Sequence, residues 1–330
     1  MNSIISPRKH LGIRKRNKQN VFCESISMLP GYPSKIRAKL SVSEKHPFFF
    51  DHPLDHVSGL QLAESMLQLA DLLADIDYGG DEKNHLYVSE IEVDFKTFCR
   101  LDQTADIHIV EMDKSGESES DHHFYRGVIN DCNKELCRGR FRISMIPSPK
   151  RGNSFQPANT NRQHHIPPCA KELINKTYEE NVFISDPSDD RHAVGTTFSI
   201  LPLRNHTFFS DTPDKGLPTL YLLEAFMQTQ RFIRYLTNYD QQYQYVTSKD
   251  ILKSVKISLE RPVGVNESPC IKLQPTVCRD LGKGLLRSGN ATLMIDTEVI
   301  GNCNIRTVVI DDDLLSALKN INAAKKGNLV

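Results

Sequence analysis

The sequence predicts an α+β fold built from two copies of one structural unit, each with a long buried helix and several antiparallel strands. The main observation is an internal repeat, because residues 46–71 match residues 206–231 at a constant offset of 160 without a gap. The identical pairs are His46 and His206, Phe48 and Phe208, Phe49 and Phe209, Asp51 and Asp211, Pro53 and Pro213, Leu60 and Leu220, Leu62 and Leu222, Glu64 and Glu224, and Gln68 and Gln228. A repeat of this length defines the unit that the rest of the chain must complete.

The composition indicates a globular protein with room for two domains. The chain has 330 residues, 39% of them hydrophobic, and its 41 basic residues balance 41 acidic ones. This balance gives no electrostatic reason to expect binding to nucleic acid or to a membrane. The eight cysteines form no CxxC pair, so we expect reduced thiols, a cytoplasmic protein, no metal site and no cofactor. No apolar segment typical of a secretory signal follows the start.

Each copy combines an aromatic run, an Asp/Pro loop and a long apolar helix that carries one acid. Ser58 and Gln61 have the spacing of a capping box, so the first helix is predicted to begin there. Pro218 suits the first position of the second helix. Both helices are apolar nearly all round, which predicts that they are buried and that other elements wrap them. They are too short and too interrupted to span a membrane.

The whole chain divides into five predicted segments. These are a basic flexible tail at 1–19, the first repeat at 20–147, a linker at 148–177, the second repeat at 178–312 and a C-terminal tail at 313–330. The basic tail has two other interpretations, an arm for an anionic partner and a transit peptide. Strands are predicted from alternating apolar residues at 91–95, 107–112, 122–129, 136–146, 251–259, 271–277, 285–295 and 299–310.

This order of elements predicts the shape of each repeat. A strand, a long buried helix and several antiparallel strands are satisfied by a strongly curved sheet that wraps the helix. That arrangement is the hotdog architecture. Two tandem copies would pair as a double hotdog, in which one chain takes the place of a homodimer; a further homo-oligomer is compatible with the sequence.

The repeated acid and amide are the candidate catalytic residues. Glu64 and Gln68 are four positions apart and share one helical face, and Glu224 and Gln228 repeat this spacing. An unpaired carboxylate in an apolar setting has a raised pKa, which suits general acid/base catalysis near neutral pH. Two other interpretations stay open. The pair marks the only solvent-facing stripe of the helix, or the acid pairs with a basic residue that closes the fold.

Other polar residues near the helices are candidate substrate-binding groups. His52 and His56 lie in the loop before the first helix, where the second copy has Thr212 and Gly216, so the two halves differ there. Arg231 follows Glu224 by seven positions on the same face and is either a phosphate contact or a partner of the helix dipole.

The remaining histidines of the repeat match each other in the two copies. His46 corresponds to His206, and each stands beside an aromatic pair. We predict a structural role for them in the aromatic loop, with catalysis as the alternative.

Two motif blocks carry a family resemblance. They are Phe48-Phe49-Phe50-Asp51-His52-Pro53 with Asp55, His56, Gly59 and Glu64, and Val182-Phe183-Ile184-Ser185-Asp186 with His206, Phe208, Phe209 and Leu222-Leu223-Glu224-Ala225. Over about residues 20–312 the chain resembles the A-factor biosynthesis hotdog family, the gamma-butyrolactone synthases.

The resemblance implies a double hotdog that moves a beta-ketoacyl group from acyl carrier protein or coenzyme A to a hydroxyl of dihydroxyacetone phosphate. The product is a precursor of gamma-butyrolactone and butenolide signals. The resemblance also gives Glu64 and Glu224 the role of the functional acid, and Gln68 or Gln228 would hold the thioester carbonyl.

One departure from the family pattern keeps alternatives open. The family carries an arginine three residues after the helix glutamate, where this chain has Leu67 and Met227. Ser58 also replaces a proline. One rival is a hotdog thioesterase or dehydratase, although Phe50 and Ser210 stand where such dehydratases have a histidine, fourteen residues before the acid. The other rival is a non-catalytic acyl-binding or interaction protein.

Overall fold

The computed structural model describes most of the chain, which folds into two compact units. The described residues are 13, 15–78, 85–112, 122–132, 134–146, 167–187, 196–203, 206–211, 216–236, 248–281 and 284–311. Unit 1 comprises Met1–Ala158, Leu203–Leu220 and Pro262–Val265, and unit 2 comprises Asn159–Pro202, Tyr221–Arg261 and Asn266–Val330. Unit 1 therefore includes the aromatic loop of the second copy. The predicted repeat boundaries themselves stay a prediction.

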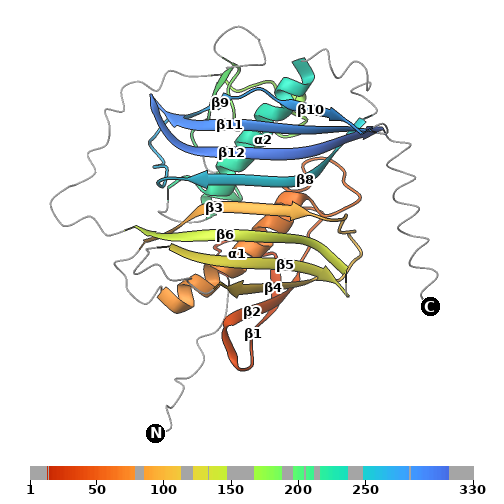
Figure 1. Cartoon of the computed structure of the whole chain (residues 1–330), viewed down its shortest axis with the longest axis vertical. Coiled ribbons are helices and arrows are strands. Elements are labelled where there is room, and N and C mark those ends of the chain that lie inside the picture. The colour runs from red at the N-terminus through yellow and green to blue at the C-terminus, as the bar shows by residue number, and fades with distance from the viewer. Residues whose placement is uncertain are drawn as a thin grey trace, which may run out of the picture. The chain divides into compact units, whose positions relative to one another are not determined.

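Unit 1 contains one long helix on an antiparallel sheet. The helix is α1 (Gly59–Tyr78), and the strands are β1 (Cys23–Leu29), β2 (Tyr32–Leu40), β3 (His85–Phe95), β4 (Asp106–Glu111), β5 (His122–Asp131) and β6 (Lys134–Ile146). Neighbouring strands pair in the order β1-β2-β4-β5-β6-β3 (Figure 1). Helix α1 packs on β1, β2, β4, β5 and β6. Strand β1 follows a short 3-10 helix, η1 (Lys18–Asn20).

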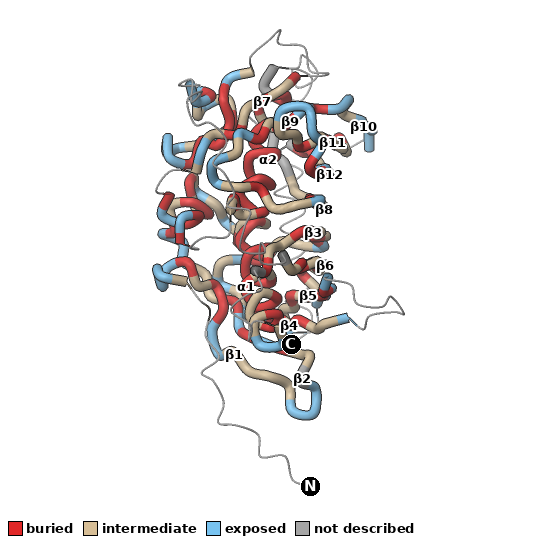
Figure 2. Tube along the Cα trace, turned by 90° about the vertical axis from the view of Figure 1, so that its left-hand side faces the viewer, coloured by how far each residue is buried: buried red, intermediate tan, exposed pale blue. Residues whose placement is uncertain are grey.

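Helix α1 begins and is buried as its sequence predicts. The hydroxyl of Ser58 accepts a hydrogen bond of 3.2 Å from the backbone N–H of Gln61, which is the N-cap half of a capping box. Met66, Leu69 and Leu73 have no exposed surface, and most of the described residues of both long helices are buried, although the last turn of α1 is not (Figure 2). Burial of this apolar surface is the main stabilising contribution of the helix.

Unit 2 repeats the plan with helix α2 (Thr219–Leu236), of which all but the first two residues belong to this unit. Its strands are β7 (Thr197–Ser199), β8 (Ser248–Leu259), β9 (Pro269–Leu273), β10 (Val277–Asp280), β11 (Leu285–Ile295) and β12 (Glu298–Asp311). They pair antiparallel in the order β8-β12-β11-β9-β7, and β10 also pairs with β11. Phe232 of α2 contacts Phe198 of β7, with ring centroids 5.3 Å apart.

The antiparallel strands of each unit, together with its long buried helix, confirm the predicted α+β class, whereas the double hotdog stays a prediction. The main strands lie where the alternation predicts them, with one split: residues 271–277 form the end of β9 and the start of β10. Strand β2 is absent from the prediction, although its buried residues Ile36, Ala38 and Leu40 alternate with the exposed Arg37 and Lys39 as in a half-buried strand. Among the described helices, none is long and apolar enough to cross a membrane.

Ordered structure begins earlier than predicted in two segments, the N-terminal tail and the linker. The sequence predicts a solvated tail up to residue 19, whereas Lys15 and Asn17 make polar contacts with unit 1. It also predicts a linker up to residue 177, whereas the 3-10 helix η3 (Lys171–Ile174) buries Ile174. Short 3-10 helices also occur at η4 (Glu179–Asn181) and η5 (Phe209–Asp211). Polar composition hides these segments, because their contacts are with residues far away in the sequence.

We predict that Gly216→Ala destabilises the protein more than Gly31→Ala does. Both glycines have a positive φ, +80° and +78°, so a side chain costs about 1–2 kcal/mol at either position. A Cβ on Gly216 would also lie 2.3 Å from the backbone oxygen of Val263, whereas a Cβ on Gly31 meets nothing within 4 Å. Urea unfolding of both variants checks this, and equal losses would contradict the steric argument.

Candidate functional site

The acid on helix α1 is paired with a lysine from the segment before β1. Glu64 Oε1 lies 3.2 Å from Lys15 Nζ and accepts a 2.9 Å hydrogen bond from Gln68 Nε2. Both members of the ion pair are largely enclosed. A buried carboxylate without a partner would be costly, so the lysine makes burial of this acid possible.

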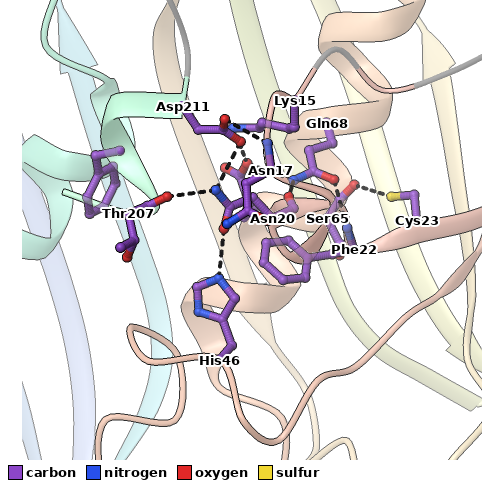
Figure 3. Close-up of polar contacts among 12 residues, drawn as sticks. Lys15, Asn17, Asn20, Phe22, Cys23, His46, Ser65, Gln68, Thr207 and Asp211 are labelled. Carbon is purple, nitrogen blue, oxygen red and sulfur yellow. Dashed lines mark hydrogen bonds and ion pairs between the residues drawn. The ribbon is translucent and has the colours of Figure 1, made fainter. Parts of the chain in front are cut away.

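The amide of Gln68 ties the same segment to the helix (Figure 3). Its Oε1 accepts a 3.0 Å hydrogen bond from the backbone N–H of Phe22, and its Nε2 donates to the backbone oxygen of Asn20 at 2.7 Å. With the bond to Glu64, both amide hydrogens are engaged. A thioester carbonyl could bind to Gln68 only if one of these bonds broke.

Unit 2 holds the same arrangement on helix α2. Lys176 Nζ lies 2.9 Å from Glu224 Oε1, and Gln228 Nε2 donates to Glu224 at 3.2 Å and to the backbone oxygen of Asn181 at 2.8 Å. The N–H of Phe183 donates to Gln228 Oε1 at 2.8 Å. The structure therefore brings each predicted acid and amide together, and adds a lysine that sequence reasoning missed.

A signal for the lysine is present in the sequence. The pattern Lys-x4-Asn-Val-Phe occurs at residues 15–22 and again at 176–183, an offset of 161. This differs by one from the offset of 160 between the helices, so a gapless extension of the helix match does not align the lysines. Both lysines also fall in segments that look like a tail and a linker.

The two carboxylates differ in their surroundings. Arg231 Nη1 lies 3.2 Å from Glu224 Oε1, whereas the corresponding position of the first copy is Asp71. Glu224 has no exposed surface, and its Oε2 has no hydrogen-bond partner among the described residues. The second copy thus places two cations and an amide on one carboxylate oxygen and leaves the other oxygen unengaged.

The prediction of a raised pKa is wrong for Glu224. Burial by itself raises the pKa of this carboxyl, but Lys176 and then Arg231, with hydrogen bonds from Lys176 and Gln228, outweigh burial and hold the pKa below its ordinary value. The prediction fails because it assumes an unpaired acid. The alternative of a basic partner that closes the fold describes the observed contacts.

His46 organises the aromatic loop of the first copy. Its Nδ1 accepts the backbone N–H of Phe48 at 3.3 Å and of Phe49 at 3.4 Å, and its Nε2 donates to Asn20 Oδ1 at 3.0 Å. His206 Nδ1 accepts the N–H groups of Phe208 and Phe209, each at 3.2 Å. These contacts agree with a structural role for both histidines.

Asn20 connects this loop to the aromatic loop of the second copy (Figure 3). Its Nδ2 donates to the backbone oxygen of Thr207 and to Asp211 Oδ2, each at 2.9 Å. Asp211 Oδ1 accepts the backbone N–H of Asn17, also at 2.9 Å. Around them the rings of Phe48 and Phe208 stack with centroids 5.3 Å apart. The segment that carries Lys15 is therefore held from both sides within unit 1.

The loop histidines lie in the segment that precedes helix α1. His56 Nδ1 is 2.7 Å from Asp55 Oδ1, and its ring packs on Phe98 at 4.8 Å. His52 is half-buried. No described contact joins either histidine to Glu64, so a substrate-binding role for them stays a prediction. In the described part of the chain, no three His, Cys, Asp or Glu side chains come together as metal ligands.

The side chain of Gln61 stands out on α1. It has no exposed surface, and neither Oε1 nor Nε2 has a hydrogen-bond partner among the described residues. The corresponding residue of the second copy is Tyr221, whose hydroxyl donates to the backbone oxygen of Leu201 at 2.7 Å. Sequence reasoning assigns Gln61 to a capping box and gives no sign of this buried amide.

A family model for the A-factor biosynthesis hotdog domain matches residues 11–145 and 157–264, which is well over half of the chain. The chain belongs to the A-factor biosynthesis hotdog family. The two matched segments contain both Lys-x4-Asn-Val-Phe patterns and both helix acids. A comparison with curated proteins finds none that matches.

Solved structures support the hotdog fold of this family member. The 12:0-ACP thioesterase from Umbellularia californica is 12% identical, with a TM-score of 0.51 over 83% of this chain and 93% of that one. A protein described as an oleoyl thioesterase from Lactobacillus plantarum is 11% identical, with a TM-score of 0.50 over 86% of this chain and 100% of that one. At these identities the similarity concerns the fold alone.

We predict that stability falls as the pH drops from 6.5 towards 4, in part because of His46. Burial lowers the pKa of His46 from 6.5 to about 4. Between these values the unfolded chain takes up a proton at His46 and the folded protein does not, so acid favours unfolding; above 6.5 the effect disappears. Urea unfolding of wild type and His46→Gln across this range checks the slope. An equal pH dependence in both proteins would contradict the assignment.

Proposed function

We propose that the protein is a double-hotdog acyltransferase that acts on acyl thioesters. It moves a beta-ketoacyl group from an acyl carrier protein or coenzyme A thioester to a hydroxyl acceptor such as dihydroxyacetone phosphate, on the way to gamma-butyrolactone or butenolide signals. Membership of the A-factor biosynthesis hotdog family supports this reaction class. The thioesterase names of the two solved relatives agree with thioester chemistry.

The observation that carries the proposal is the carboxylate of Glu224. Lys176 and Arg231 hold it in the charged form, and its Oε2 has no partner among the described residues. An ionised carboxylate with one open oxygen can orient an acceptor hydroxyl and take its proton. Because Glu224 has no exposed surface, the acceptor reaches Oε2 only after neighbouring side chains move.

In the proposed reaction, the acceptor oxygen attacks the thioester carbonyl carbon while its proton passes to Glu224 Oε2. The C–O bond forms, the C–S bond breaks, and the proton returns from Glu224 to the departing thiolate. The lowered pKa keeps Glu224 charged at neutral pH but makes it a weaker base, so orientation of the hydroxyl is a large part of its contribution.

The other candidate residues take supporting roles in this proposal. Glu64, with Lys15 and Gln68 on one oxygen, is the corresponding acid of the first copy. Gln68 and Gln228 hold the segments that carry Lys15 and Lys176 in place, and contact with the thioester carbonyl requires the loss of one of their bonds. His52 and His56 are proposed to line the approach to the first helix.

Arg231 is the proposed contact for a phosphorylated acceptor. Its side chain is 28% exposed and uses Nη1 on Glu224. A guanidinium has five N–H donors, so the remaining donors can bind a phosphate while Nη1 stays on the carboxylate. The same arginine would thus place the acceptor next to the base. This supplies a cation on the helix although Leu67 and Met227 stand where the family has arginine.

We predict that Glu224→Gln lowers acyl transfer at least about a hundred-fold, because the amide keeps the shape but cannot take a proton. Purified protein is incubated with a beta-ketoacyl thioester and dihydroxyacetone phosphate, and the ester product and released thiol are measured. Glu64→Gln is the matched variant in the first copy. Thermal unfolding checks that both variants fold, and full transfer by a folded Glu224→Gln protein would show that this acid is not the base.

We predict that Arg231→Ala weakens the use of dihydroxyacetone phosphate about ten- to a hundred-fold and leaves thioester binding nearly unchanged, since a charge-assisted contact contributes about 1.5–3 kcal/mol. Arg261→Ala is the control, because Arg261 pairs with Glu267 and Glu298 at the surface.

Titration of the acceptor distinguishes the proposed acyltransferase from a thioesterase and from an acyl-binding protein. Thiol release without acceptor dependence favours a thioesterase, and thioester binding without any turnover favours an acyl-binding protein. Identical acceptor titrations for wild type and Arg231→Ala would count against a phosphate site at Arg231.

A further inference from the structure

The buried amide of Gln61 has no structural explanation within the described residues. Its side chain is fully enclosed, yet its oxygen and its nitrogen have no hydrogen-bond partner there. Buried amides in folded proteins are nearly always hydrogen-bonded, because leaving them unpaired costs the full desolvation of the group. A residue of this kind destabilises the fold and calls for another reason to be present.

Helix capping does not supply that reason. Ser58 Oγ accepts the backbone N–H of Gln61, and Ser58 O accepts the backbone N–H groups of Gln61 and Leu62, so these N–H donors at the helix start are satisfied by Ser58. The side chain of Gln61 takes no part in it. The internal repeat does not explain the buried amide either, because the corresponding residue of the second copy is Tyr221, whose hydroxyl donates to the backbone oxygen of Leu201.

The position of Gln61 points to the site around Glu64. It precedes Glu64 by three residues and Gln68 by seven, and these spacings place all three on one face of α1. The amide hydrogens of Gln68 are both in use, so Gln61 offers the open carboxamide on this face.

We propose that Gln61 is a substrate-binding residue of unit 1, whose carboxamide pairs with a carbonyl group of the thioester substrate. Nε2 donates to the substrate carbonyl, and Oε1 accepts from an amide N–H where the ligand has one. This inference rests on the proposed function, because it takes the ligand to be an acyl thioester. Since the amide has no exposed surface, the ligand must displace side chains beside it, and the hydrogen bonds gained favour that displaced arrangement.

Two parts of such a substrate carry the required carbonyl: the beta-ketoacyl group and the amides of the pantetheine arm. Stable thioether analogues separate them. The probes are beta-ketoacyl-pantetheine thioether, the same compound with a saturated alkyl chain in place of the ketoacyl group, and free pantetheine. Dissociation constants are measured by calorimetry for wild type, Gln61→Leu and Gln61→Met, two substitutions of similar volume without an amide.

We expect both variants to unfold at the same temperature as wild type or higher, since an unpaired buried amide is removed, and to bind the ketoacyl probe about ten-fold more weakly or worse. Tyr221→Phe is the stability control, because removing a satisfied hydroxyl should lower its unfolding temperature. An effect confined to the ketoacyl probe assigns the contact to the acyl group. An effect on all three probes assigns it to the arm.

Three results would overturn the proposal: both variants bind every probe as wild type does, both unfold at a clearly lower temperature, or wild type binds none of the probes. The measurement needs no turnover. If wild type binds the probe through Gln61 but transfers no acyl group, the substrate contact stands and the proposed reaction fails.

Discussion

Burying a carboxylate on an apolar helix is costly unless a cation is buried beside it, and this constraint shapes both units. Helix α1 has no lysine or arginine, and helix α2 contributes Arg231. The chain brings Lys15 and Lys176 from the segments that precede the first strand of each copy. Once the lysine is in place, the helix acid, the amide one turn later and the backbone of the lysine-bearing segment form a single hydrogen-bonded cluster. The position of these segments therefore depends on the helix acid and amide, and the reverse also holds.

The cluster also decides what chemistry each acid can perform. With two cations, Glu224 is a charged hydrogen-bond acceptor at neutral pH, and the raised pKa expected of a lone buried acid does not arise. The first copy has Asp71 in place of the second cation, so two helices with the same acid and amide present different electrostatic environments. Duplication has preserved the contacts that build the unit, and the residues around them have diverged.

Much of the fold could be predicted because it depends on local patterns. The helices, the strands with clean alternation and the paired acid and amide all follow from spacing within one element. The ion pairs could not be predicted in the same way, because Lys15 and Glu64 are brought together only by the fold and Lys15 looks like part of a basic tail. The side chain of Gln61 could not be predicted for a different reason. Its spacing from Ser58 correctly marks the helix start, but spacing carries no information on where the side chain points.

The contact of Asn20 with Thr207 and Asp211 has a consequence for how the protein is made. Unit 1 includes Leu203–Leu220, so its buried asparagine acquires two of its acceptors only after the chain has been synthesised well past the end of the first copy. Until then Thr207 and Asp211 cannot accept from the Asn20 amide, and Phe208 cannot cover the ring of Phe48. Contacts this far apart in sequence close slowly, because a long loop must be ordered first. The nascent first copy is therefore an incomplete folding unit, and the second copy completes it.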